Sequence, residues 1–360
     1  MSPGHRLNKP LKGRGSVFSV EPCYLGTARE AVDDGWGSVD LEPPRLHTTV
    51  TEERIRGIIN RNESPDLPFN LSINPYRGCE HGCVYCYARP AHAFMDLSPG
   101  LDFESRLFSK PDAPEVLRRE LAKPHYRCET IALGANTDAY QPIEKRLKIT
   151  RHLLEVLAEC SHPVTIVSKS ALIERDVDLL APMAEKKLVQ VFISVTTLDR
   201  ELARRMEPRA AAPQRRIETQ RRLNDAGIPT GVMFAPVIPA LNDHELETIL
   251  EHGAQAGCRF AGTIVLRLPR EVKPMFKEWL AAHYPLKYDR VMNRIRDLRG
   301  GHESDAQFGR RMKGQGVFAR LLAQRFERSC QALGMNESRF ELDTSRFRAP
   351  GRNTDQLELF

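Results

Sequence analysis

Three cysteines fall within eight positions of the chain, at Cys79, Cys83 and Cys86, with the spacing C-x3-C-x2-C. Gly78 and Gly82 beside them allow the backbone to curl around a bound group without a Cβ clash. Three thiolates on one tight turn suit three irons of a [4Fe–4S] cube, whose protein ligands are normally cysteines. No fourth cysteine follows at short spacing, so one iron would be open to a ligand that is not a protein side chain.

Two other interpretations fit the same residues. A structural zinc ion takes Cys3His ligand sets at overlapping spacings, and His81 or His92 would supply the fourth ligand. His81 stands between two of the cysteines, so it would have to fold back onto the same metal. Three thiols without any metal are the third interpretation. The other cysteines are scattered, as is typical of small buried apolar residues: Cys23, Cys128, Cys160, Cys258 and Cys330.

The cysteine spacing, with the aromatic Tyr85 directly before the last cysteine, resembles the motif of the radical S-adenosylmethionine (SAM) superfamily. The resemblance implies a [4Fe–4S] cluster whose open iron binds the amino and carboxylate groups of SAM. It implies reductive cleavage of SAM to methionine and a 5′-deoxyadenosyl radical, which takes a hydrogen atom from the substrate. It also implies an electron donor such as flavodoxin or ferredoxin. The protein would position the reactants and keep the site dry.

Short apolar runs alternate with amphipathic segments through most of the chain. The pattern predicts strands at 71–74, 130–133, 164–167, 189–195, 231–235 and 263–266. It predicts helices at 114–122, 145–159, 174–186, 213–226 and 243–256. A repeated strand–helix order implies a parallel sheet, and six units indicate an α/β fold with a partial (β/α)6 barrel of the TIM type. A doubly wound open sheet is the alternative.

Composition divides the chain into four regions. Residues 1–50 are rich in Gly, Pro and charge and are expected to form a flexible tail. The barrel is expected at 51–285, a basic helical extension at 286–344 and a second flexible tail at 345–360. A short helix is expected at 50–60. Asn242 is expected to cap the 243–256 helix, with Glu245 as its capping-box partner.

Polar side chains follow two of the predicted strands, where barrels of this kind place functional residues. Asn136, Thr137 and Asp138 come after the second strand and offer acceptors to a SAM ammonium group. The same residue types are also favoured in turns and helix caps. Lys169 comes after the third strand and is placed to pair with the SAM carboxylate, although lysines commonly lie on the surface.

Further candidates follow along the chain. Ser194, in the fourth strand, offers a hydroxyl to the ribose or carboxylate of SAM. Glu207 and Arg209 lie at a helix-to-loop boundary, where they would contact SAM or substrate, or form a plain surface pair.

The residues Asn-Thr-Asp, Ser-Lys-Ser and Ile-Ser-Val at these three positions resemble the spore photoproduct lyase branch, which includes DNA repair photolyase-like proteins. The similarity spans roughly residues 65–285. That lyase uses a cysteine near the end of the second strand as hydrogen donor to the product radical. This chain has Gly134, Ala135 and Asn136 there, which puts thymine-dimer repair itself in doubt. Tyr140 is the candidate donor instead, and a buried aromatic residue is its other interpretation.

The 360 residues are 41% hydrophobic and 28% charged with a net charge of +6, which excludes collagen, pure coiled coil and full-length disorder. No apolar run reaches the roughly 20 residues of a membrane helix, and no secretory signal is visible, so a cytoplasmic protein is expected. Nucleic acid is favoured as substrate by the lyase resemblance and by arginines in the extension, partly offset by Asp297, Glu303 and Asp305. These arginines are Arg290, Arg294, Arg296, Arg299, Arg310, Arg311, Arg320, Arg325 and Arg328.

The expected function is therefore a radical SAM enzyme that acts on nucleic acid, by lyase-like DNA repair or by modification. A radical SAM enzyme with a small-molecule or protein substrate is one alternative. A non-enzymatic, metal-stabilised nucleic-acid-binding module is another.

The last five residues form a separate motif. Gln356, Leu357, Leu359 and Phe360 resemble the short Gln-Leu-x-Leu-Phe peptide by which bacterial replication and repair proteins bind the DNA sliding clamp. Five residues are few, and such endings also occur by chance or pack back onto the domain. If the motif is used, it connects the chain to DNA independently of the barrel.

Overall fold

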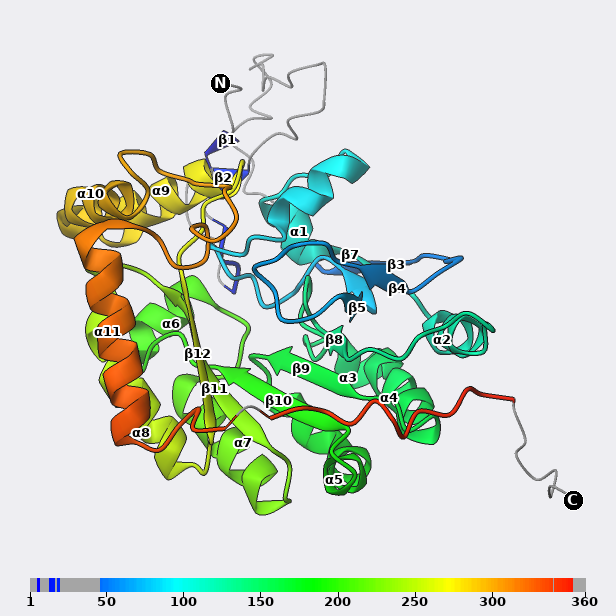
Figure 1. Cartoon of the computed structure of the whole chain (residues 1–360). Helices are drawn as coiled ribbons and strands as arrows, with labels where there is room; N and C mark the ends of the chain where they lie inside the picture. The colour runs from blue at the N-terminus through cyan, green and yellow to red at the C-terminus, as the bar shows by residue number, and fades with distance from the viewer. Residues whose placement is uncertain (1–4, 7–12, 17, 20–45, 339, 352–360) are drawn as a thin grey trace, which may run out of the picture.

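The structure is a computed structural model and describes residues 5–6, 13–16, 18–19, 46–338 and 340–351. Its central element is a seven-stranded sheet in the order β12-β11-β10-β9-β8-β5-β4 (Figure 1). Adjacent strands from β5 to β12 are parallel, and β4 pairs antiparallel with β5 at one edge. The bounds are β4 Ile59–Arg61, β5 Leu71–Ile73, β8 Ile131–Leu133, β9 Val164–Ser168, β10 Val189–Ser194, β11 Thr230–Val237 and β12 Phe260–Val265.

The strand order decides between the two predicted architectures. From β5 to β12, each parallel strand lies beside the next one along the chain, so the sheet winds in a single direction. A doubly wound sheet would reverse direction at a switch point. The sheet still has two edges, β4 and β12, and is therefore an open barrel. The predicted α/β fold with a partial barrel of the TIM type is confirmed.

Helices cover the outer face of the curved sheet (Figure 1). They are α2 Ala113–Leu121, α4 Ile149–Glu159, α5 Val177–Glu185, α7 Pro213–Asp225 and α8 Leu246–Gln255. In β9, Val164 and Ile166 are buried against this layer, while Thr165 and Val167 alternate with them and are only half-buried. The inner face of the barrel is thus hollow and partly open to solvent.

Two predictions about helices need correction. The 145–159 helix is broken, because Lys148 adopts φ +55° between α3, Glu144–Leu147, and α4. The short helix expected at 50–60 is wrong, since β3 Thr49–Glu52 and β4 occupy this segment. The β-branched run at the start of β3 suits a pleated strand, and Val50 lies opposite Leu107 of β7, Arg106–Ser109.

The predicted helix cap at Asn242 is also wrong. Its side chain makes no capping hydrogen bond, and its Oδ1 accepts from Ile238 N at 2.6 Å while its Nδ2 donates to Thr196 O at 2.8 Å. Glu245 accepts from Thr197 Oγ1 at 2.9 Å. Asn242 thus serves a backbone N–H after β11 and a backbone carbonyl after β10, and Glu245 serves a hydroxyl after β10. Both side chains therefore stabilise these loops.

The chain after β12 is mainly helical, as predicted, with α9 Val272–His283, α10 Tyr288–Leu298 and α11 Gly316–Ala332. Figure 1 shows α11 running alongside α8. Phe276 and Trp279 of α9 and Val291 of α10 share one apolar cluster with Val84 and Tyr85 of the cysteine loop. The helices α9 and α10 therefore support the loop that carries the cysteines.

A polar contact spans the gap between the two sheet edges. Asp66, in the loop between β4 and β5, accepts from Gly309 N at 2.6 Å and pairs with Arg311, which also donates to Ser64. The segment that bears Arg311 is attached to β12 at its other side, because Val265 N donates to Met312 O at 2.9 Å. This clasp narrows the open side of the barrel.

Parts of both predicted tails are docked. Near the C-terminus, the ring of Phe347 lies 5.4 Å from that of Tyr126 and 5.3 Å from that of His162, and Arg348 N donates to Cys160 O. At the N-terminus, residues 14–16 contact the cysteine loop. Residues 356–360, which hold the clamp-like motif, lie outside the described residues. Within the described ranges, no helix is long and apolar enough to cross a membrane.

Candidate active site at the cysteine loop

The three cysteines lie on the turn that follows β6, Tyr76–Arg77. Cys79 and Cys83 are buried and Cys86 is half-buried, and burial raises the pKa of all three thiols. Gly78 adopts φ +76°, and a Cβ there would stand 2.8 Å from Phe103 O. The glycine next to the first cysteine is therefore required by the turn, as the sequence indicated.

The arrangement of the cysteines fits a cluster better than a single metal ion. Within the described residues, no three His, Cys, Asp or Glu side chains converge closely enough to share one ion. A zinc ion needs its sulfur ligands at about 2.3 Å from one point, whereas each cysteine of an iron–sulfur cube binds a different iron. His81 Nδ1 lies 3.3 Å from Asp138 Oδ2 and His92 Nε2 lies 3.0 Å from Arg106 O, so one ring nitrogen of each histidine already has a partner in the fold.

Residues between the first two cysteines are held from outside the loop. Glu80 accepts from Thr48 Oγ1 at 2.9 Å and pairs with Arg209 at 3.0 Å, and its amide donates to Gln141 Oε1 at 2.9 Å. Arg209 N also donates to His81 O. The structure thus places Arg209 against the cysteine loop, as a residue that fixes the turn.

Asp138 lies beneath the same loop. Its Oδ1 accepts from Ser168 Oγ at 2.8 Å and Tyr140 N at 2.9 Å, and its Oδ2 accepts from Lys169 N at 2.8 Å and faces His81. Burial alone would raise the pKa of Asp138, but His81 and these donors outweigh it and lower the pKa to about 2. The four acceptor positions of this carboxylate are occupied, so we assign it to positioning the loop and not to direct SAM contact.

The neighbours of Asp138 divide into one structural residue and one exposed residue. Thr137 is buried and its hydroxyl donates to Tyr76 O at 3.1 Å. Asn136 is exposed, and its amide N–H donates to Asn74 Oδ1 at 2.8 Å. Of these two residues, only Asn136 has an exposed side chain.

Lys169 lies on the cysteine side of the barrel, where the sequence placed it. Its Nζ is 5.9 Å from the centre of the Tyr85 ring. Its charge also opposes the pKa rise of Cys83 and Cys86 and favours ionisation of Glu207. A half-buried ammonium next to the cysteines suits a ligand carboxylate.

Glu207 is the centre of a buried polar cluster. It accepts from the Tyr85 hydroxyl, from Thr196 Oγ1 at 2.7 Å and from the Arg216 guanidinium. Burial opposes its ionisation, but Arg216 and Lys169 outweigh this effect and lower the pKa of Glu207 to about 2. Glu207 is therefore a fixed negative charge next to the cysteine loop, with Tyr85 oriented by it.

Sequence reasoning missed Arg216. Arg216 lies on α7, and its Nη1 donates to Ser194 O at 3.0 Å, so that it joins Glu207 to the end of β10. Its face of the helix also carries Ile217 and Leu223, which are buried. This apolar period was the available signal that Arg216 points inward. The predicted Ser194 is buried at the same strand end.

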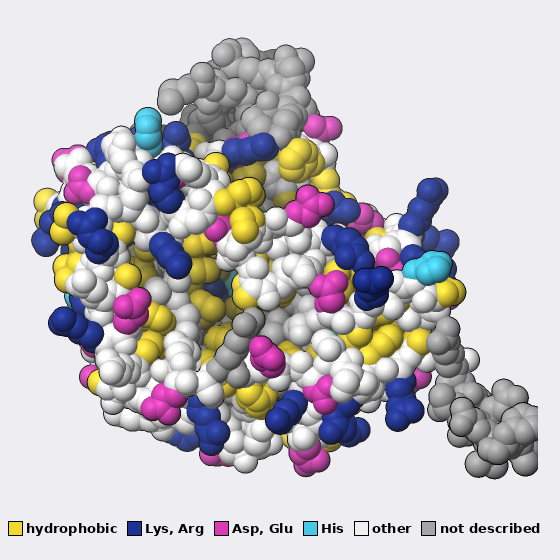
Figure 2. Space-filling model, viewed as in Figure 1, with side chains coloured by type: hydrophobic (Ala, Val, Ile, Leu, Met, Phe, Trp, Pro, Cys, Tyr) yellow, Lys and Arg dark blue, Asp and Glu magenta, His cyan; other side chains and the backbone are white. Residues whose placement is uncertain are grey.

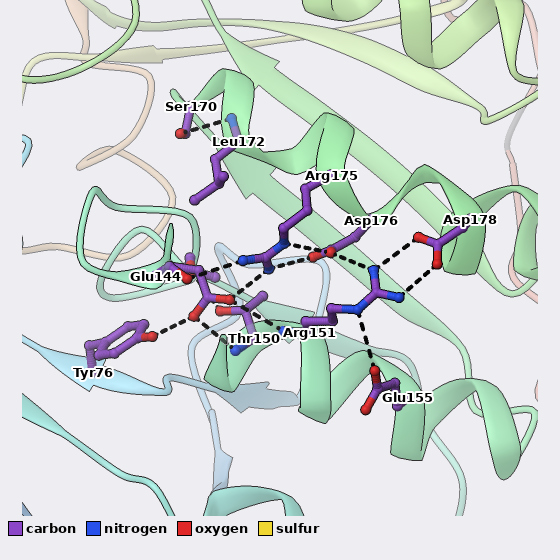
Figure 3. Close-up of polar contacts among 11 residues, drawn as sticks. Tyr76, Glu144, Thr150, Arg151, Glu155, Ser170, Leu172, Arg175, Asp176 and Asp178 are labelled. Carbon is purple, nitrogen blue, oxygen red and sulfur yellow. Dashed lines mark hydrogen bonds and ion pairs between the residues drawn. The ribbon is translucent and has the colours of Figure 1, made fainter. Parts of the chain in front are cut away.

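Tyr140 does not lie where a hydrogen donor would act. It is fully buried in the main core. Burial raises the pKa of its hydroxyl, and the nearby carboxylate of Asp176 raises it further. Figure 3 shows the polar network there, with Arg175 between Glu144 and Asp176. The burial of Tyr140 favours its other interpretation, that of an aromatic residue of the core.

A cavity of about 320 Å³ adjoins the cysteine loop. Gly78 and Ala88 form one wall, and its polar lining is supplied by the amides of Asn60, Asn74 and Asn136 and by the ammonium of Lys110. Figure 2 shows hydrophobic side chains in the hollow of the face it presents, with Lys and Arg side chains around the periphery among acidic ones. The structure thus has a pocket with a polar lining next to the cysteine loop.

Comparisons with known proteins agree with this geometry. The family model described as the radical SAM superfamily matches residues 73–253. An uncharacterized protein of Mycobacterium tuberculosis is 38% identical over 64% of this chain and 68% of its own length. An uncharacterized protein of Methanocaldococcus jannaschii is 28% identical over 62% of this chain and 79% of its own length.

Among solved structures, spore photoproduct lyase complexed with dinucleoside spore photoproduct has the same fold. It superposes with a TM-score of 0.53 at 16% identity, covering 79% of this chain and 80% of that chain. The family model covers about half of the chain and includes the cysteine motif and the four parallel strands from β8 to β11. The chain belongs to the radical SAM superfamily, whose cofactors are a [4Fe–4S] cluster and S-adenosylmethionine.

Proposed function

We propose that this protein is a cytoplasmic radical SAM enzyme that acts on nucleic acid, by lyase-like repair or by modification. When bound, the cluster and SAM supply a 5′-deoxyadenosyl radical, with an electron from a donor such as flavodoxin or ferredoxin. The chain supplies the positions of the reactants. Cys79, Cys83 and Cys86 hold the irons, and Lys169 binds the carboxylate of SAM. Glu207 and Arg216 orient Tyr85 and Ser194 next to it.

The observation that carries the substrate class is a set of aromatic side chains around the barrel mouth, each with an arginine against its ring. Tyr87 is 50% exposed, and the Arg267 guanidinium lies 5.7 Å from its ring centre. Phe94 is 68% exposed, with Arg270 at 6.0 Å. Tyr87 also donates to Ala135 O, at the C-terminal end of β8. Tyr87 thus lies at the end of the barrel where the cysteines lie.

A third pair completes this aromatic–arginine rim. Phe308 is 53% exposed, and Arg311 lies 4.5 Å from its ring centre. Burial and the nearby charge of Arg311 lower the pKa of Arg267, so two guanidinium groups stand close together at the mouth. Because Arg311 already pairs with Asp66, Arg267 is the guanidinium that is placed to bind a phosphate.

Exposed aromatic rings interleaved with arginines are the surface that single-stranded nucleic acid uses, because bases stack on the rings and phosphates pair with the guanidinium groups. The adjoining cavity fits the same substrate. Its amides at Asn60, Asn74 and Asn136 can donate to and accept from base edges, and Lys110 adds a positive charge. The lyase of the same fold, which is crystallised with a dinucleoside, supports this choice by analogy.

Binding measurements test the proposal. Fluorescence anisotropy with labelled oligonucleotides should give at least tenfold tighter binding to single-stranded than to fully paired DNA, because stacking requires free base faces. The affinity should fall as salt rises, with a slope that corresponds to about two or three phosphate contacts. Absence of binding to single-stranded DNA and RNA at about 100 μM protein would contradict the proposal.

The C-terminal motif of Gln356, Leu357, Leu359 and Phe360 supports the same assignment independently. We propose that it docks on a bacterial sliding clamp, which would bring the enzyme to DNA.

A further inference from the structure

A short piece of N-terminal chain, residues 14–16, lies against the cysteine turn. The amides of Gly15 and Ser16 donate to the two carboxylate oxygens of Glu104, at 3.0 and 2.9 Å. Glu104 also pairs with Arg89 at 2.6 Å, and both of these side chains are completely buried. Arg89 Nε in turn donates to Cys83 O at 2.8 Å. A continuous path of hydrogen bonds thus joins the N-terminal segment to the second cysteine of the motif.

The contact between the segment and the turn is too close for any side chain. A Cβ on Gly15 would stand 1.7 Å from Gly82 O. A Cβ on Gly82 would in turn stand 2.8 Å from Glu104 Oε2 and 3.3 Å from Gly15 N. The two glycine backbones are therefore packed directly on each other, with Glu104 beside them.

The side chain of Arg14 fastens the segment in place. It donates to Glu104 O at 2.6 Å, to Leu46 O at 3.1 Å and to Thr48 Oγ1 at 3.2 Å. The Thr48 hydroxyl donates to Glu80, between the first two cysteines. Residues 14–16 thus hold the turn at two places, at Glu80 through Thr48 and at the backbone of Gly82 by direct packing.

Removal of this segment would leave the buried carboxylate of Glu104 with fewer donors. A buried carboxylate without its partners costs several kcal/mol, and water would replace the missing amides. That water would enter at Gly82, between Cys79 and Cys83.

We propose that residues 14–16 are a strap that fixes the cysteine turn in its cluster-binding conformation and excludes water and dioxygen from it. The inference concerns the cofactor site and does not depend on the nature of the substrate. Solvent exposure is one of the factors that set the reduction potential of an iron–sulfur cluster. Reduction adds negative charge to a centre that already has three thiolates, and water stabilises the more highly charged state. Opening the strap would therefore make the potential less negative.

The direct test is Gly15→Val, whose side chain cannot fit against Gly82. The matched control is Gly13→Asn, because no atom of the described residues lies within 4 Å of a Cβ at Gly13 and asparagine tolerates its positive φ of +78°. In the protein without cluster, hydrogen exchange of the peptide covering residues 78–86 should become at least tenfold faster in Gly15→Val. It should stay unchanged in Gly13→Asn.

Two measurements on reconstituted protein separate a strap from general support of the fold. In Gly15→Val, air should bleach the cluster at least fivefold faster, and the midpoint potential should be less negative than in Gly13→Asn. Equal exchange, bleaching and potential in the two variants would overturn the proposal. Where Gly15→Val does not fold by circular dichroism, Arg14→Ala decides, since it removes three hydrogen bonds and keeps both glycines. It should at least double the exchange and bleaching rates, and unchanged rates would again overturn the proposal.

Discussion

Glu207 and Arg216 form a completely buried ion pair directly behind Tyr85, the aromatic residue of the cysteine motif. The pair joins the end of β10 to the loop that holds the cysteines, through Ser194 O on one side and the Tyr85 hydroxyl on the other. Because both charges are buried, each depends on the other. Lys169, by contrast, is half-buried and lies over the Tyr85 ring. Arg216 is therefore expected to stabilise the fold, and Lys169 to bind the ligand.

Replacing Arg216 should mainly lower stability, whereas replacing Lys169 should mainly weaken SAM binding. Arg216→Ala should lower the free energy of unfolding by about 3–5 kcal/mol, because it leaves Glu207 as an unpaired buried charge. Lys169→Ala should lower it by less than about 1 kcal/mol, yet weaken SAM binding at least tenfold with the cluster intact. Urea unfolding of the protein without cluster and equilibrium binding of SAM to reconstituted protein are the measurements. Unweakened SAM binding in Lys169→Ala would refute its assignment.

Acid should destabilise the fold through Glu207. The pKa of this carboxyl is about 2 in the folded protein and 4.5 in a model peptide. A lowered folded pKa stabilises the protein above pH 4.5, and this stabilisation is lost as the pH falls from about 5 towards 2. The loss should amount to a few kcal/mol. The Glu207→Gln variant cannot titrate at this position, so its unfolding free energy should change less over the same range. Identical pH dependences would exclude the ionised Glu207.

The aromatic–arginine rim can be tested at its most exposed member. Phe94→Ala should weaken binding of single-stranded oligonucleotides by about tenfold, since stacking on one ring contributes about 1–3 kcal/mol. Leu286→Ala is the control, because Leu286 is fully exposed and lies between α9 and α10, outside the rim. Both variants should retain wild-type stability by urea unfolding. An equal loss of affinity in the two variants would rule out the rim as the binding surface.

Most of the barrel could be predicted from periodicity, because strands and helices alternate regularly between residues 131 and 265. The segment at 50–60 could not, since its pairing partners in β7 and β5 are set by tertiary contacts. Composition also assigned residues 14–16 and 347 to tails. Their contacts depend on backbone amides and a single aromatic ring, which leave no periodic signal.

The residues of the candidate site could be predicted where the chemistry requires a particular residue type. They could be predicted less well where the role of a side chain depends on its hydrogen-bond or ion-pair partners. The cysteines and Lys169 carry their chemistry in their identity and position. Arg215 and Arg216 are adjacent and identical in type, yet Arg215 pairs with Glu174 on the outside and Arg216 with Glu207 inside. By position, Tyr140 was a plausible hydrogen donor and Asp138 a plausible SAM contact, and only the burial of Tyr140 and the four donors around Asp138 indicate a structural role.

The C-terminal motif makes a prediction independent of the barrel. A peptide of residues 350–360 should bind a bacterial sliding clamp with micromolar-class affinity, because Leu359 and Phe360 can fill an apolar pocket and Gln356 a polar one. Isothermal titration calorimetry is the measurement, with a peptide lacking Leu359 and Phe360 as control. No binding at about 100 μM clamp, which corresponds to less than ~5.5 kcal/mol, would contradict the docking role.

The central claim is tested most directly by the formation of 5′-deoxyadenosine. Protein reconstituted anaerobically with iron and sulfide, then reduced in the presence of SAM, should produce it. Single-stranded DNA or tRNA should increase the rate at least tenfold over no substrate, and an unrelated peptide should not. Variants of Cys79, Cys83 or Cys86 to Ala should be inactive, whereas Cys160→Ala and Cys258→Ala, which alter buried packing residues, should be active. Equal rates with nucleic acid, with peptide and without substrate would contradict the account.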